Sequence, residues 1–134
     1  MDPFSICVGC SSLAEIVFKV SSEILTLIKT YRGAREELLQ LKLQLDELTA
    51  ILELLKRDEE SYGSLNQPAS EKTQEQINIC MDIMNDIENV LREHQGSWGR
   101  AVWTACGKSH VMRLSKKLAA AVEHFKLCVG IYNW

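Results

Sequence analysis

The sequence predicts an all-α protein, a helical bundle of four main helices plus a short fifth helical segment. Only two prolines and seven glycines occur in 134 residues, and leucine, glutamate, lysine and alanine are common. Apolar residues recur at three- and four-residue steps over four long stretches, as on a helix with one buried face. The whole chain, residues 1–134, is expected to form one domain.

The first helix is expected over residues 3–31. Asp2 can cap it, and Pro3 suits a first turn because its missing N–H costs nothing there. Residues 3–14 carry no charge, yet they would span only about 18 Å of a hydrocarbon layer that is ~30 Å thick. A buried bundle helix is therefore favoured over a permanent span, and conditional insertion remains open. Its apolar seam is Ile6, Cys10, Leu13, Val17, Val20, Ile24, Leu27 and Tyr31.

A leucine-rich stripe predicts a second helix over residues 34–60. Residues 61–70 contain Gly63, Asn66 and Pro68 without apolar periodicity, so we expect a loop there. The stripe consists of Leu38, Leu41, Leu45, Leu48, Leu52 and Leu55, widened by Leu39, Leu43, Ile51 and Leu54.

The third helix is expected to begin with Ser70 or Thr73 as its cap and to end near residues 94–96. Residues 98–106, between glycines, are long enough for the short fifth segment, and the last helix begins near Ser109. The two seams are Ile77, Cys80, Met84, Ile87 and Leu91, then Val111, Leu114, Leu118, Ala121, Phe125, Cys128 and Tyr132.

Charge is uneven along a chain whose net charge is only -3. Residues 36–60 carry eight acidic and three basic groups, whereas residues 98–134 carry one acidic and six basic groups. This pattern predicts pairing between the two segments first and binding of anionic lipid second. Nucleic-acid binding is not expected, because the basic residues are few within an acidic whole.

No catalytic, metal or cofactor site is expected. The chain has no G-x-S-x-G elbow and no H-E-x-x-H pattern. The Cys7-x-x-Cys10 pair lacks a second pair of ligands for structural zinc. Five cysteines, an odd number on mostly apolar positions, favour reduced thiols in a cytosolic protein: Cys7, Cys10, Cys80, Cys106 and Cys128.

Several stretches resemble HeLo-like domains, which lie at the N-termini of many fungal STAND (NLR-like) receptors and related cell-death proteins. The similar stretches are Met1-Asp2-Pro3-Phe4-Ser5-Ile6, Val20-Ser21-Ser22, the leucine helix, Trp103-Thr-Ala-Cys-Gly-Lys108 and the Val111, Leu114, Leu118 spacing. The resemblance implies a helical death effector of innate immunity or heterokaryon incompatibility. Such a domain is cytoplasmic at rest. Receptor oligomerisation or an amyloid-signalling domain, expected beyond Trp134, would trigger it to oligomerise and permeabilise the plasma membrane.

We hypothesise that the first helix then enters the phospholipid bilayer. Burying an apolar side chain is worth about 1.5 to 3 kcal/mol in either surrounding, so exchanging protein for lipid largely cancels. The membrane-inserting candidates are Phe4, Ile6, Val8, Leu13, Ile16 and Val17, the pore-lining candidates are Glu15 and Lys19, and the headgroup-binding candidates are Arg113, Lys116 and Lys117. The alternative is a non-enzymatic adaptor whose second and third helices bind another helical domain.

Overall fold

Four helices and no strand make up the part of the chain that the structure describes, residues 3–30, 35–62, 67–93 and 107–129 of a computed structural model. Side chains are described for residues 9–29, 36–56, 71–93 and 107–128. The helices are α1 (Pro3–Thr30), α2 (Arg35–Tyr62), α3 (Gln67–Glu93) and α4 (Lys108–Val129). The predicted four-helix, all-α architecture is confirmed, whereas the predicted fifth segment lies outside the described residues.

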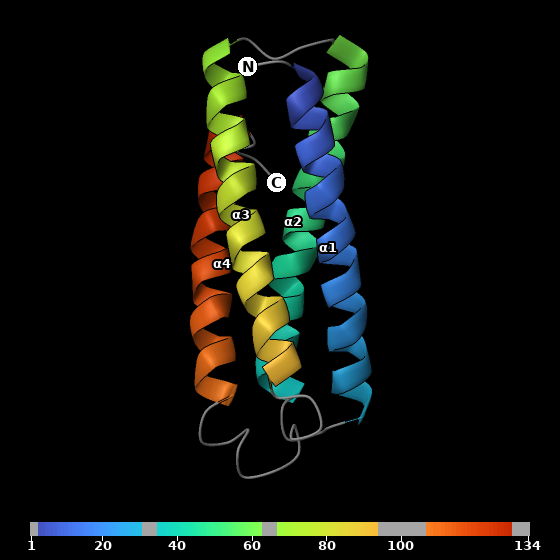
Figure 1. Cartoon of the computed structure of the whole chain (residues 1–134), viewed down its shortest axis with the longest axis vertical. Coiled ribbons are helices and arrows are strands. Elements are labelled where there is room, and N and C mark those ends of the chain that lie inside the picture. Colours follow the sequence, from blue (N-terminus) through green and yellow to red (C-terminus); the bar gives the residue numbers. More distant parts are fainter. Residues whose placement is uncertain (1–2, 31–34, 63–66, 94–106, 130–134) are drawn as a thin grey trace.

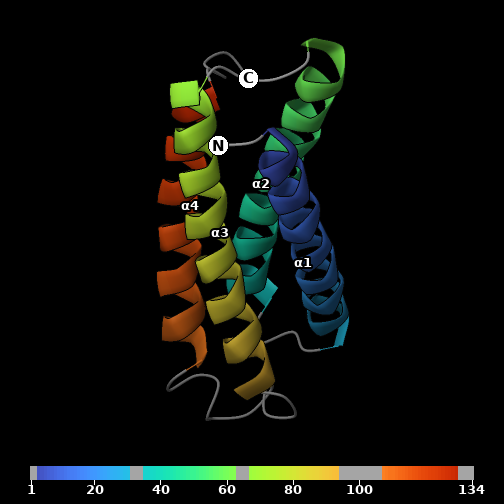
Figure 2. The same cartoon turned by 45° about the horizontal axis from the view of Figure 1, so that its top comes forward.

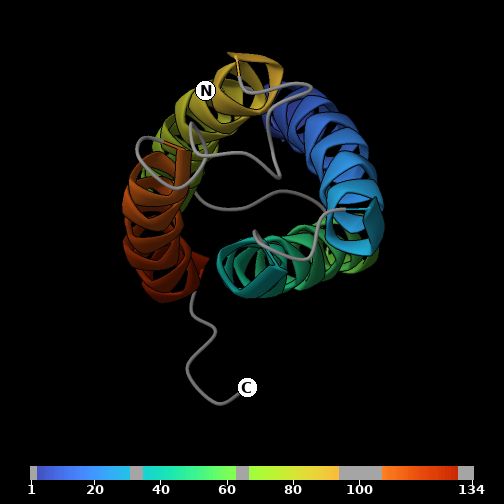
Figure 3. The same ribbon diagram turned by 90° about the horizontal axis from the view of Figure 1, so that it is seen from below.

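The helices form a ring in the order α1, α2, α4, α3 (Figures 1 and 3). Each helix packs on two neighbours, so α1 lies diagonally across from α4, and α2 lies diagonally across from α3. The direction of the chain makes α1 antiparallel to α2 but parallel to α3, and the tilted view in Figure 2 shows the same arrangement. α1 therefore occupies one corner of the bundle and contacts chiefly α2 and α3.

The core contains the predicted seams almost residue for residue. In α2, all six leucines of the predicted stripe are buried, and in α3 and α4 the seams are buried from Ile77 to Leu91 and from Val111 to Phe125. Three of the four residues expected to widen the α2 stripe are not in the core, because Leu39 is 41% exposed, Leu43 is 56% exposed and Leu54 is only half-buried. The ring geometry explains this difference, since each helix needs to cover only two neighbours.

The connection between α2 and α3 is shorter than predicted. α2 continues to Tyr62 and α3 begins at Gln67, so six of the ten residues expected to form a loop are helical. Pro68 is the second residue of α3, where a missing N–H leaves no hydrogen bond unmade. The expectation that Ser70 or Thr73 caps this helix was wrong, since both lie inside α3 and Thr73 is fully buried.

Candidate functional site

The predicted membrane-inserting residues of α1 lie in the bundle core wherever their side chains are described. Leu13 is fully buried, Val17 is 1% exposed, and Ile16 is partly buried against the same cluster. The side chains of Phe4, Ile6 and Val8 lie outside the described residues. Entry of Leu13 and Val17 into a membrane would therefore require α1 to leave α2 and α3.

The predicted pore-lining residues lie on the outer surface of α1. Glu15 is exposed, and the ammonium of Lys19 lies 3.8 Å from a carboxylate oxygen of Glu88 on α3. Glu88 also accepts a hydrogen bond of 3.0 Å from Arg92 in its own helix. The Lys19 side chain remains 61% exposed, so this ion pair is largely hydrated and holds α1 to α3 only weakly.

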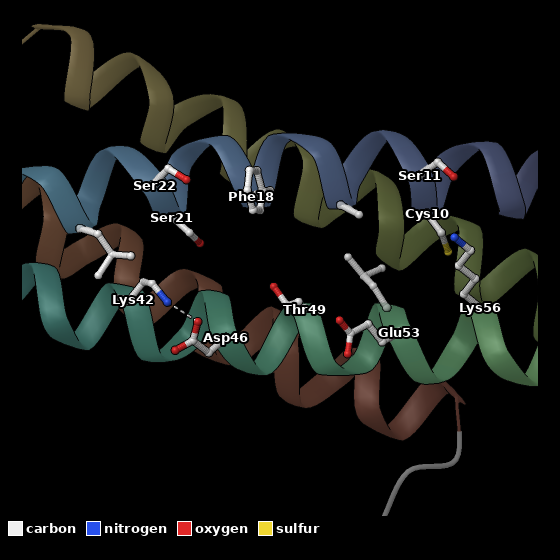
Figure 4. A pocket seen from close by; sticks show the side chains of 13 residues that line it. Cys10, Ser11, Phe18, Ser21, Ser22, Lys42, Asp46, Thr49, Glu53 and Lys56 are labelled. Atoms are coloured by element: carbon white, nitrogen blue, oxygen red, sulfur yellow. Dashed lines mark hydrogen bonds and ion pairs between the residues drawn. The ribbon is translucent and has the colours of Figure 1, made fainter.

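A groove of about 470 Å³ runs between α1 and α2 (Figure 4). Phe18 projects from α1 near the middle of the groove and is 76% exposed. Ser21, Lys42 and Asp46 lie toward one end, and Ser11 and Lys56 lie toward the other. The lining consists of Cys10, Ser11, Ala14, Phe18, Ser21, Ser22 and Leu25 from α1, and Lys42, Asp46, Thr49, Leu52, Glu53 and Lys56 from α2.

Short side chains on α1 create this groove. Ser11, Ala14, Ser21 and Ser22 follow one side of the apolar seam, so they cannot fill the space between two helices whose axes are typically 8–10 Å apart. The Oγ atom of Ser21 is buried and has no hydrogen-bond partner among the described residues. The α1–α2 interface is therefore incompletely packed along the outer surface of the bundle.

A second groove, of about 350 Å³, flanks α1 on its other side. It is formed with α3 and is lined by Lys19, Glu23, Thr26, Leu27, Glu88, Leu91 and Arg92. α1 and α3 pack closely near the start of α1, because a Cβ added to Gly9 would lie 3.3 Å from the Cγ2 atom of Ile77. α1 thus has a buried apolar seam, with one groove beside it toward α2 and another toward α3.

Ion pairs join α4 to α2 more firmly. Lys108 Nζ lies 3.2 Å from Glu37 Oε1, and Lys126 Nζ donates a hydrogen bond of 3.0 Å to Glu47 Oε1. That hydrogen bond raises the pKa of Lys126, because the carboxylate stabilises the ammonium form. The predicted pairing of the basic C-terminal segment with the acidic middle segment is confirmed at these two positions.

The headgroup-binding candidates Arg113, Lys116 and Lys117 are exposed on α4. α4 lies diagonally across the ring from α1, so the outward faces of the two helices point in opposite directions (Figure 3). The structure therefore does not bring the headgroup candidates together with the pore-lining candidates. One flat membrane cannot touch both outward faces while α1 remains in the bundle.

The sequence interpretation missed the groove and its central aromatic residue. Ala14, Phe18 and Leu25 are spaced by four and seven residues, which places them along a second apolar line beside the main seam. This second line is shorter than the main seam, so the prediction of one apolar seam per helix does not include it. A second, shorter apolar line on the same helix is the sequence feature that could have indicated the groove.

The described residues do not form a metal site. No group of three or more histidine, cysteine, aspartate or glutamate side chains there could hold a metal ion. Cys10, Cys80 and Cys128 carry thiols rather than disulfides. Burial raises the pKa of the Cys80 thiol to about 12, which leaves almost no reactive thiolate near neutral pH.

These features define a four-helix bundle domain whose first helix is bordered by grooves. None of the helices in the described part of the chain has both the length and the apolar character needed to cross a bilayer. A family model described as "Pigment biosynthesis cluster protein PigL N-terminal" matches residues 1–103, and the chain belongs to this PigL_N family. The match includes α1, α2 and α3, and α4 lies beyond it. No curated protein and no solved structure matches the chain.

Proposed function

We propose that this domain is a HeLo-like, membrane-permeabilising cell-death effector of a fungal immune or incompatibility signalling protein. It is cytoplasmic at rest. On activation several copies gather at the plasma membrane, release α1 and insert it. The observation that carries the proposal is the packing of α1, whose apolar seam is buried while grooves border it on both α2 and α3.

The composition of α1 supports its transfer into lipid. Four of its 28 residues are charged, whereas twelve of the 28 residues of α2 are. A charge at the centre of a bilayer costs about 2.5 to 3.5 kcal/mol on insertion scales, and less when it faces water in an assembled pore. Glu15 and Lys19 would face such a lumen, because both already lie away from the buried seam.

The diagonal position of α4 supports an order of events. Arg113, Lys116 and Lys117 can attach the resting bundle to anionic headgroups at roughly 1 kcal/mol each, because they are exposed. α1 then faces away from the bilayer and reaches it only after leaving the ring. Attachment through α4 precedes insertion of α1 in this scheme.

Hydrogen exchange and dye release test the proposal together. Copies carrying a C-terminal His tag are crowded on anionic liposomes that contain a nickel-chelating lipid, and exchange is followed by mass spectrometry. We expect α1 amides to lose their bundle protection while α3 amides, the internal control, keep theirs, with dye released in parallel. The proposal fails if α1 stays as protected as α3 at high surface density, or if a folded variant lacking residues 1–20 releases dye equally well.

Exposed leucines on α2 favour an adaptor as the second candidate function. Leu39 and Leu43 are 41% and 56% exposed on one side of α2, where another helical domain could dock. An adaptor would bind a protein partner without floating with liposomes, and Glu15→Gln would leave its binding unchanged. Flotation of the chain with anionic liposomes therefore separates the two functions.

A further inference from the structure

We infer that the groove between α1 and α2 is a binding site for one free long-chain fatty acid. The alkyl chain lies along the groove between Ala14, Phe18 and Leu52, and the carboxylate lies at the Lys56 end. This inference goes beyond the proposed function, because it concerns the intact bundle in solution and needs no membrane.

The dimensions of the groove match a single alkyl chain. The α1 residues that line it run from Cys10 to Leu25, so the groove is about 22 Å long at ~1.5 Å per residue. A volume of about 470 Å³ over that length gives a mean cross-section of about 21 Å², whereas a helix ~10 Å wide has a cross-section of about 80 Å². A polypeptide helix could therefore lie only across the open mouth of the groove, whereas a single alkyl chain can lie inside it.

The volume also indicates the length of the chain. An apolar protein cavity of ~150 Å³ holds one benzene molecule, which corresponds to about 25 Å³ per carbon atom. The groove of about 470 Å³ would then hold about 19 carbon atoms. Fatty acids of 16 to 18 carbons fall just within this limit.

The charges on the rim orient the fatty acid. At the Ser21 end, Lys42 donates a hydrogen bond to Asp46, and this ion pair leaves little net charge for a ligand. At the other end Lys56 is exposed and has no ion-pair partner among the described residues, and Cys10 lies across the groove from it. Glu53 lines the same side of the groove between Thr49 and Lys56, but it is exposed, so its carboxylate can stay in water while the alkyl chain passes. A carboxylate is thus best placed beside Lys56, with the methyl end toward Leu25.

Binding of cis-parinaric acid, a fluorescent 18-carbon fatty acid, tests the inference without liposomes. We expect one probe molecule per chain, displaced by saturated fatty acids whose affinity rises about fourfold per methylene and levels off near 18 carbons. Absence of binding would overturn the inference. Binding of several probes per chain, or competition that does not depend on chain length, would do so as well.

Paired variants locate the site. Ala14→Trp fills the groove and should abolish probe binding, whereas Ser12→Trp, on an exposed position of α1 outside the lining, should leave it unchanged. Lys56→Gln should weaken palmitate binding about two- to fivefold without affecting hexadecanol, and Lys72→Gln on α3 is its charge-matched control. Equal binding by Ala14→Trp would refute the site. A concentration-dependent dimer that Ala14→Trp disrupts would instead assign the groove to a second copy of the chain.

Discussion

Replacing Leu13 by alanine tests whether α1 is docked in the resting protein, the state from which the proposed release begins. Leu13 is fully buried in the core cluster, and Phe18, five residues further along α1, is 76% exposed. Phe18→Ala is therefore the matched control. It removes a larger side chain from the same helix but takes little apolar surface out of the core.

The expected effects of the two substitutions differ several-fold. Truncating a fully buried leucine to alanine costs about 3 kcal/mol, from lost burial and from the cavity that remains. For a domain of 134 residues, the entropy of unfolding is about 0.28 kcal/mol/K, so Leu13→Ala should lower Tm by about 11 °C. Phe18→Ala should change the free energy of unfolding by no more than about 0.5 kcal/mol, or Tm by about 2 °C.

Urea unfolding followed by far-UV circular dichroism measures both variants. We expect the midpoint of Leu13→Ala to fall while the m-value stays that of the parent protein, which shows that the same surface is exposed on unfolding. A loss of under about 1 kcal/mol for Leu13→Ala, or equal losses for the two variants, would mean that α1 is not packed in the resting bundle. The release mechanism would then lack its starting state.

Three further predictions follow from other contacts. The stability that Lys126 contributes through Glu47 should be complete below the ordinary lysine pKa of 10.5 and should disappear as the pH rises through the raised pKa of Lys126. The urea midpoints of the parent protein and of Lys126→Met should therefore converge at high pH. At pH 8, iodoacetamide should modify Cys80 about a thousandfold more slowly than an ordinary exposed cysteine, because burial raises the pKa of Cys80 to about 12. Peptide mapping that finds comparable rates in the folded protein would contradict that burial. Gly9→Leu should separate α1 from α3, because even a Cβ at this position lies 3.3 Å from the core residue Ile77. This variant should therefore increase dye release from liposomes. Unchanged release would argue against exit of α1.

The four helices could be predicted because their apolar seams are long and regular. The stripe from Leu38 to Leu55 is buried as expected, since a three-four spacing leaves one continuous face to cover. The ends of the helices were harder to predict. Pro68 was interpreted as a loop residue, although proline is equally suited to a first helical turn.

The candidate site could not be predicted to the same extent. A seam identifies the face of a helix that is buried, but it does not reveal how completely two neighbouring helices fill the space between them. The groove depends on Ser21 and Ala14 of α1 facing Thr49 of α2, three residues that no local pattern connects. Likewise, the diagonal position of α4 relative to α1 is set by the order of helices in the ring, which is a tertiary property.

The corner position of α1 has a consequence for how copies could associate. α4 contacts both α2 and α3, so departure of α1 would leave a contiguous three-helix remnant rather than separate pieces. That remnant would display an apolar trough shaped to receive a first helix, and the freed first helix of a neighbouring molecule has the matching seam. Exchange of this segment between molecules would build a domain-swapped, head-to-tail chain that grows without any new complementary surface.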